Sequence, residues 1–87
     1  PSLGLYYKPI TGALRDYKFV PFKDSAGNNI RQADAAIRNN PELLAQACNS
    51  ISNCKGFNSN GWLKHTVKPE SQFTTWTSNP ALGFYYK

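Results

Sequence analysis

The stretch over residues 40–64 constrains the fold most, because it contains both cysteines, one of the two tryptophans and the clearest helix signal. Asn40 suits the N-cap, Pro41 suits the first helical position, and Glu42 lies in the first turn, where a negative charge stabilises the helix dipole. Apolar residues then recur at helical spacing, namely Leu43, Leu44, Ala47 and Cys48. This pattern predicts a helix over residues 41–48 with one apolar stripe.

The residues after Cys48 predict a loop followed by two strands. Residues 49–53 are mostly polar, as is typical of a helix end and a loop. A strand-like pattern begins at Cys54, residues 58–61 form a turn signal, and a second strand begins at Trp62. We therefore expect one cysteine on the helix and the other on the strand beside it.

This stretch resembles the PAN/apple module. The resemblance rests on Ala47-Cys48, five further residues, Cys54-Lys55-Gly56-Phe57-Asn58, and Gly61-Trp62-Leu63-Lys64. Cys54 to Phe57 match the family's strand motif of a cysteine, any residue, a small residue and an aromatic one. The resemblance implies an α+β fold in which one main helix crosses a twisted antiparallel sheet of four to five strands. Residues 1–87 would then be a single such module, or one unit of a larger or tandem chain.

The same resemblance implies a disulfide between Cys48 and Cys54. The family's second disulfide is absent, since the chain has no other cysteine. Its helix partner would fall at Leu44 and its strand partner near Trp62 or Leu63, so an apolar contact is expected there. We assign Trp62 to the core for this reason.

Other segments give weaker signals. Residues 14–20 alternate between polar and apolar, which predicts a half-buried strand that Pro21 ends or places at a sheet edge. Residues 22–29 predict a loop, and the alanines within residues 30–37 predict a short helix. Residues 67–79 predict a polar loop that contains Phe73 and Trp76.

The two ends of the chain nearly repeat each other. Residues 3–8 and 82–87 both have the pattern Leu-Gly-X-Tyr-Tyr-Lys, and differ only at Leu5 and Phe84. Either the two segments are neighbouring strands of one sheet, or the hexapeptide recurs along a tandem array. In a strand the two adjacent tyrosines must face opposite sides.

Catalytic and metal-binding patterns are weak. His65 is the only histidine, the five acids are scattered, and no glycine-rich phosphate loop or CxxC motif occurs. Residues 24–29 offer oxygen ligands but lack the further acids of an EF-hand, so they predict a turn. The apolar runs are far shorter than the ~18–20 residues of a membrane span. We expect no enzyme, cofactor, metal site or transmembrane segment.

Charge and aromatic content point toward binding. A net charge of +5 favours acidic partners, although the lysines could equally serve only to solvate the surface. Residues 17–23 interleave aromatics with bases, yet no nucleic-acid motif is present and we expect no such partner. Two tryptophans, five tyrosines and five phenylalanines exceed the needs of so small a core, so some should be exposed.

Trp76 is the first candidate for an exposed platform, because threonines and a serine flank it. Its ring could stack on the apolar face of a sugar, with Tyr17, Arg15 and Asn28 joining it if the first hairpin folds beside it. Alternatively, Trp76 covers the open side of the sheet under a long loop.

The expected function is that of a non-catalytic, extracellular adhesion module, as the PAN/apple resemblance implies. Carbohydrate is the expected ligand because of the aromatic and amide-rich loops. One alternative is a protein-interaction module of a multidomain secreted protein or protease. Another is a structural repeat in a surface array, which would contain further copies of the terminal hexapeptide.

Overall fold

The computed structural model describes residues 12–87 and shows an α+β fold. One helix, α1 (Pro41–Asn49), accompanies three 3₁₀ helices, η1 (Gly12–Asp16), η2 (Ala35–Ile37) and η3 (Glu70–Gln72). The strands are β1 (Lys18–Pro21), β2 (Lys23–Asp24), β3 (Asn29–Gln32), β4 (Gly56–Asn58), β5 (Trp62–Lys64), β6 (Thr74–Thr75) and β7 (Gly83–Tyr86).

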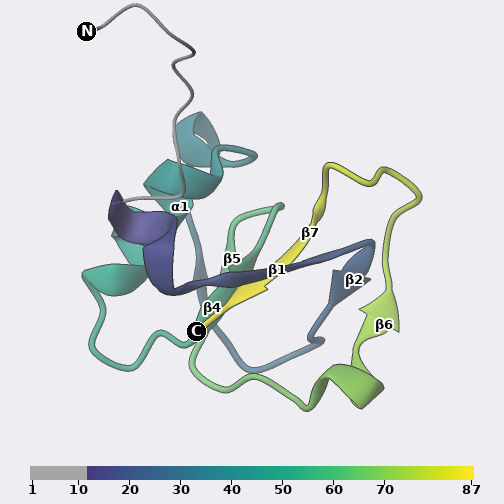
Figure 1. The fold of residues 1–87 in the computed structure, drawn as a ribbon. Coiled ribbons are helices and arrows are strands. Elements are labelled where there is room, and N and C mark those ends of the chain that lie inside the picture. The colour runs from purple at the N-terminus through teal and green to yellow at the C-terminus, as the bar shows by residue number, and fades with distance from the viewer. Residues whose placement is uncertain (1–11) are drawn as a thin grey trace, which may run out of the picture.

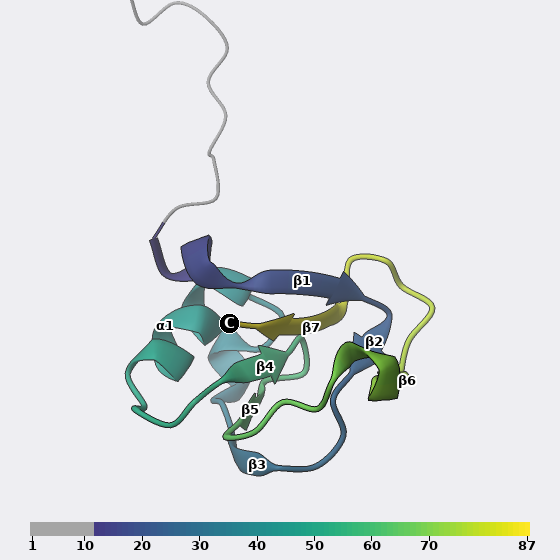
Figure 2. The same ribbon diagram turned by 60° about the horizontal axis from the view of Figure 1, so that its bottom comes forward.

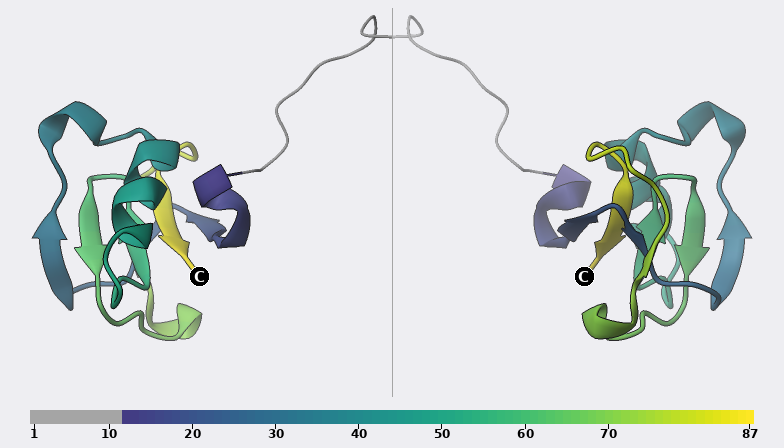
Figure 3. Two further views of the ribbon diagram at one scale, coloured as in Figure 1. Left: turned by 90° about the vertical axis from the view of Figure 1, so that its left-hand side faces the viewer. Right: turned by 90° about the vertical axis from the view of Figure 1, so that its right-hand side faces the viewer.

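These strands form two antiparallel sheets. The main sheet has five strands in the order β1-β7-β4-β5-β3, which Figure 2 shows in succession, and β2 pairs separately with β6. Helix α1 and the β2–β6 pair lie on opposite sides of the main sheet (Figures 1 and 3). The expected combination of one main helix with an antiparallel sheet of four to five strands is confirmed.

Helix α1 begins as its sequence predicts. Asn40 is the N-cap, and its side chain accepts a hydrogen bond of 3.3 Å from the backbone N–H of Leu43. Pro41 occupies the first turn, where a missing N–H has no cost. The helix ends at Asn49, one residue later than expected, and it buries Leu44, Ala45 and Cys48 against the sheet.

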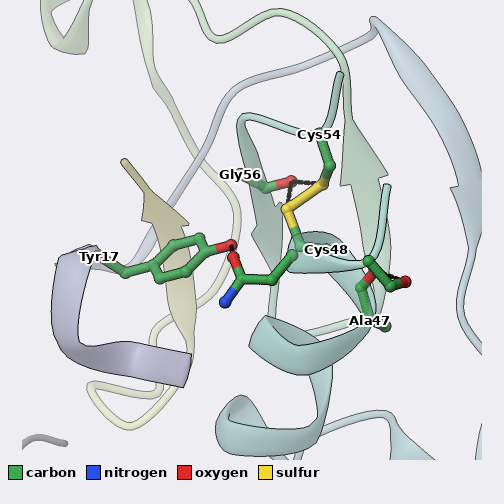
Figure 4. Close-up of a disulfide and its surroundings, with 7 residues drawn as sticks. Tyr17, Ala47, Cys48, Cys54 and Gly56 are labelled. Carbon is green, nitrogen blue, oxygen red and sulfur yellow. Dashed lines mark hydrogen bonds between the residues drawn. A yellow bond between two sulfur atoms is a disulfide. The ribbon is translucent and has the colours of Figure 1, made fainter. Parts of the chain in front are cut away.

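The expected disulfide is present between Cys48 and Cys54 (Figure 4). The S–S distance is 2.05 Å, the Cα atoms are 5.3 Å apart, and both residues are buried. A small residue is required next to this link, because a Cβ atom at Gly56 would lie only 2.6 Å from the carbonyl oxygen of Tyr85. The glycine thus lets β4 and β7 approach closely beneath the helix.

A row of side chains crosses the sheet on the helix side. Phe19, Tyr85 and Phe57 occupy directly opposed positions on β1, β7 and β4, and Leu63 follows on β5. The Phe57 and Tyr85 rings stack with centroids 4.9 Å apart, and those of Phe19 and Tyr85 are 4.6 Å apart. Phe57 and Leu63 of this row form the core together with the buried face of α1, and Tyr85 packs against that core.

The assignment of Trp62 to this core was wrong. Leu44 and Leu63 are both fully buried in the core cluster, whereas Trp62 is only half-buried and lies outside that cluster. The physical reason is strand alternation, since Leu63 points toward the helix and its neighbour must point to the other face.

The opposite face of the main sheet has its own aromatic cluster. Phe73 is buried and packs edge-on against Phe84 and Tyr86, with centroid distances of 5.3 and 5.9 Å. Tyr85 and Tyr86 therefore face opposite sides of the sheet, as the strand pattern requires. The plug that the sequence suggested for this face is Phe73, not Trp76.

The strand predicted over residues 14–20 begins later than expected. Residues 12–16 form η1, and only Lys18–Pro21 pair as β1. A tertiary contact overrides the alternating pattern, because Glu42 of α1 accepts a 3.0 Å hydrogen bond from the backbone N–H of Ala13 and so holds the segment against the helix. Pro21 does end a strand at the sheet edge, as predicted.

Three other expectations were wrong in part. Residues 22–29 contain β2 and the start of β3, and the expected helix over residues 30–37 is reduced to η2 after β3. Residues 67–79 contain η3 and β6 within the expected loop. Each added strand depends on a partner distant in sequence, which local propensity does not reveal.

The repeated ends can be assessed only in part. The C-terminal copy forms β7, whose two edges pair with β1 and β4. Both edges of β7 are therefore paired with strands of the described part of the chain. The strand expected over residues 3–8 itself lies outside the described residues.

Candidate functional site

Two large apolar side chains stand out as exposed, with Phe22 at 37 % and Trp76 at 38 % of their full accessible surface. Phe22 links β1 to β2, and Trp76 directly follows β6. The backbone oxygen of Phe22 accepts hydrogen bonds of 2.8 Å from Trp76 N–H and 3.3 Å from Thr77 N–H. The β2–β6 pair thus brings both aromatics to one end of the small sheet, at the right of Figure 1.

These residues line an open hollow of about 520 Å³. Its lining residues, which carry two aromatic rings, one ammonium group and three hydroxyl groups between them, are Phe22, Lys23, Thr75, Trp76, Thr77 and Ser78. Binding sites for small polar ligands commonly combine apolar walls with a few placed polar groups. Apolar stacking and hydrogen bonding are therefore both available within one hollow.

The backbone at Phe22 is strained. Its φ is +70°, in the left-handed region that a bulky side chain rarely adopts. The hydrogen bonds around it impose this conformation, since Phe22 N–H donates to Leu82 O at 2.9 Å and its own oxygen accepts from the segment after β6. Strain of this kind is often found at functional sites, and here it accompanies an exposed ring.

Among residues 12–87, Lys23 is the only ionisable residue that lines the hollow. It pairs directly with Thr75 across the small sheet, and its Nζ donates a 2.9 Å hydrogen bond to the Thr75 hydroxyl. Within residues 12–87, the single ion pair is that of Lys18 with Glu70. Lys23 is therefore positioned by a neutral group and has no carboxylate partner in the described part of the chain.

The next residue along β2 anchors the small sheet to the main one. Asp24 accepts a 3.1 Å hydrogen bond from the Asn58 side chain, and the Asn58 side-chain oxygen accepts from Trp62 N–H at 3.0 Å. Adjacent strand residues point to opposite faces, so Lys23 points toward the hollow and Asp24 toward the main sheet. Partly buried polar contacts thereby hold β2, which carries Lys23, against the main sheet.

A buried lysine holds the turn after β2. The Lys64 ammonium donates to Gly27 O at 2.8 Å and to the Asn29 side chain at 2.5 Å. Burial lowers the pKa of Lys64, and nearby Asp24 partly opposes that shift. Of the predicted turn over residues 24–29, only residues 25–28 connect strands, because Asp24 belongs to β2 and Asn29 to β3. The oxygens of Gly27 and Asn29 accept from an ammonium group. No group of three or more His, Cys, Asp or Glu side chains suited to a metal ion occurs within residues 12–87.

The other predicted site residues do not join Trp76, since none of them lines the hollow. The Tyr17 ring packs 5.3 Å from Phe57, and its hydroxyl donates at 2.7 Å to Asn49 at the end of α1 (Figure 4). Burial, assisted by the charge of Asp16, raises the pKa of Tyr17 to about 12. Arg15 is exposed on η1, and Asn28 occupies the turn before β3.

Sequence reasoning did not identify Phe22 and Lys23 as partners of Trp76. They lie in residues 17–23, where aromatic and basic residues are interleaved. That pattern did not indicate where these side chains lie in the fold. Their role depends on the pairing of β2 with β6, two strands of two residues each. Nothing in such short segments predicts that they pair.

Two curated relatives match the chain, both from Acanthamoeba polyphaga mimivirus. The protein named "Putative glycosyltransferase R655" is 41 % identical over 64 residues, which cover 74 % of this chain and 18 % of the relative. The one named "Putative fucosyltransferase R654" is 44 % identical over 61 residues, which cover 70 % of this chain and 10 % of the relative. The chain thus spans less than a fifth of either. No family model and no solved structure matches it.

Among residues 12–87, no helix has the length and apolar character needed to cross a membrane.

Proposed function

We propose that this chain is a non-catalytic module that binds carbohydrate in the hollow between Phe22 and Trp76. The observation that carries the proposal is the exposure of these two rings at one end of the β2–β6 pair. An exposed ring loses contact with water favourably when it covers the C–H face of a sugar ring. The hydroxyls of Thr75, Thr77 and Ser78 can exchange hydrogen bonds with those of the sugar.

The relatives support a carbohydrate-related role. Both are named for the transfer of sugars, and each contains a segment similar to this chain. The shared segment is a small part of each relative, so we propose that it holds a glycan while another part performs the transfer. The lining of the hollow agrees with a binding role, since the described residues there offer two aromatic rings, one lysine and three hydroxyls.

We also propose that the module is PAN/apple-like and acts in an oxidising compartment, outside the cell. Support for the family comes from a helix lying across an antiparallel sheet and linked to the adjacent strand segment by Cys48–Cys54. Support for the location comes from the same disulfide, since such links persist mainly in oxidising compartments.

Retention on an array of glycans and polysaccharides, at low and raised salt, tests the binding proposal. We expect binding that survives raised salt, because stacking and directed hydrogen bonds are screened less than diffuse charge. Trp76→Ala should weaken binding at least tenfold while circular dichroism shows an intact fold.

Trp62→Ala is the matched control, since it removes the same side chain outside the hollow. It should leave glycan affinity unchanged. A Trp76→Ala variant that binds as well as the wild type would overturn the proposed site. Failure to bind any glycan would favour a protein partner instead.

A further inference from the structure

We infer that the ligand of the hollow is an anionic saccharide, carboxylated or sulfated, and that Lys23 binds its charged group. The inference rests on the proposed function and names the ligand class for the same site. Its starting point is the composition of the lining, in which Lys23 is the only ionisable group from the described part of the chain and lies among aromatic and hydroxyl side chains.

The Lys23 ammonium has unused hydrogen-bonding capacity. It carries three N–H donors, and one of them donates to the Thr75 hydroxyl at 2.9 Å. That bond restrains the side chain beside Trp76 without neutralising its charge. A restrained ammonium with free donors is suited to a carboxylate or sulfate oxygen, and such charge-assisted bonds are stronger than neutral ones.

Other groups near β2 do not neutralise Lys23. The adjacent carboxylate, that of Asp24, accepts from Asn58 on the side that faces the main sheet. The Lys18 ammonium pairs with Glu70 and the Lys64 ammonium bonds to the turn after β2, so neither of these two lysines is directed at the hollow. Among the lining groups of residues 12–87, an anion in the hollow would therefore meet one positive charge and no carboxylate.

The arrangement combines two requirements in one ligand. The rings of Phe22 and Trp76 favour the apolar face of a sugar, and the ammonium favours a negative substituent on that sugar or the next one. A neutral glycan would satisfy only the first requirement. Selectivity for the anionic form should thus arise at this one residue and not from the net charge of +5.

Two matched polymer pairs test the inference, polygalacturonate with its methyl ester and dextran sulfate with dextran. Each pair keeps the sugar backbone and removes the charge, and together they separate carboxylate from sulfate. Affinity is measured by calorimetry for the wild type and for Lys23→Gln, Lys55→Gln and Trp76→Ala. Lys55 is the matched control because it is exposed, lies directly before β4 outside the hollow, and its substitution removes the same charge.

We expect the anionic member of at least one pair to bind more tightly than its neutral partner. Lys23→Gln should lower that affinity roughly three- to tenfold, as for one exposed charge-assisted bond. Lys55→Gln should leave it nearly unchanged, and Trp76→Ala should abolish binding.

Three results would overturn the inference. Equal loss in the two lysine variants would mean that only net charge attracts the polymers. Equal binding of neutral and anionic members that still needs Trp76 would leave the proposed function intact but remove the anion selectivity. If none of the four polymers bound in a Trp76-dependent way while the array still retained neutral glycans, the anion selectivity would again be rejected and the proposed function would stand. If the array retained no glycan either, the proposed function would be rejected as well.

Discussion

The two sides of the main sheet use aromatic side chains in different ways. On the helix side, Phe57 is fully buried and stacks on Tyr85 beneath a helix that a disulfide links to the sheet. On the other side Phe73 fills the core position, and the small sheet holds Phe22 and Trp76 exposed. The comparison shows that the core uses only some of the aromatic side chains, and that the exposed pair, Phe22 and Trp76, lies at one site.

The two sides also differ in what holds them. The helix side depends on apolar burial and a covalent link between residues close in sequence. The small sheet depends on polar contacts between distant residues, such as Asn58 with Asp24 and Lys64 with Gly27. We therefore expect substitutions on the helix side to affect stability, and those around the hollow to affect binding.

The largest expected contrast is between Phe57→Ala and Trp76→Ala. Removing the fully buried Phe57 ring should lower the free energy of unfolding by about 3–5 kcal/mol, because a cavity remains. Removing the exposed Trp76 ring should lower it by less than about 1 kcal/mol. Urea denaturation measures both, and similar losses in the two variants would contradict the proposed division of roles.

Loss of the disulfide should have the next largest effect. The Cys48→Ala, Cys54→Ala double variant should lose about 2–3 kcal/mol in the free energy of unfolding, since the unfolded chain regains the freedom of a short loop. Glycan affinity, measured well below the denaturation midpoint, should be unchanged. A folded double variant with weakened affinity would show that the two sides are coupled.

The decline of the free energy of unfolding at alkaline pH should depend on Tyr17, on the helix side of the sheet. The folded-state pKa of Tyr17 is about 12, above its ordinary value of 10.0, so the unfolded chain releases this proton first as pH rises. The stabilisation is complete below pH 10.0 and declines as the pH approaches 12. Tyr17→Phe should flatten this decline in pH-dependent denaturation.

Absorbance titration of tyrosinate provides the check on that assignment. The wild type should show a phenol that ionises late, near pH 12, and this step should be missing in Tyr17→Phe. The burial of Tyr85 also raises its pKa, so the variant should remove one late step and leave others. If Tyr17→Phe instead removed an ionisation step with the ordinary pKa of a tyrosine, the buried environment of Tyr17 would be refuted.

The smallest effect should come from backbone strain at Phe22. Phe22→Gly and Phe22→Ala both remove the ring, but only glycine adopts a φ of +70° without cost. The glycine variant should be more stable than the alanine variant by about 1 kcal/mol. Both should weaken glycan binding, and equal stability of the two would show that this conformation is not held in solution.

Sequence reasoning succeeded where signals are local. Asn40 and Pro41 marked the start of α1, and the resemblance correctly implied the disulfide formed by Cys48 in its last turn. It failed where placement depends on distant partners, as with the β2–β6 pair. Trp62 shows a third case. Its strand was predicted, but the face of the sheet to which its side chain points was not, because neighbouring residues of a strand point to opposite faces.

The candidate site was partly accessible from sequence. Trp76 was identified because hydroxyl residues flank it and the chain has more aromatics than its core needs. Phe22 was not, since its exposure follows from a strained φ and from hydrogen bonds to residues after β6. Tyr17 was chosen for its aromatic character, yet its ring is partly buried and packs against the core.

A titration of the ¹⁵N-labelled protein with a glycan retained on the array tests the central claim most directly. We expect amide shifts to change at residues 22–24 and 74–78, where the hollow lies, and to stay constant at residues 44–57 on the helix side. Changes centred on α1 and the disulfide, with none around Trp76, would contradict the assignment of binding to the exposed aromatic pair.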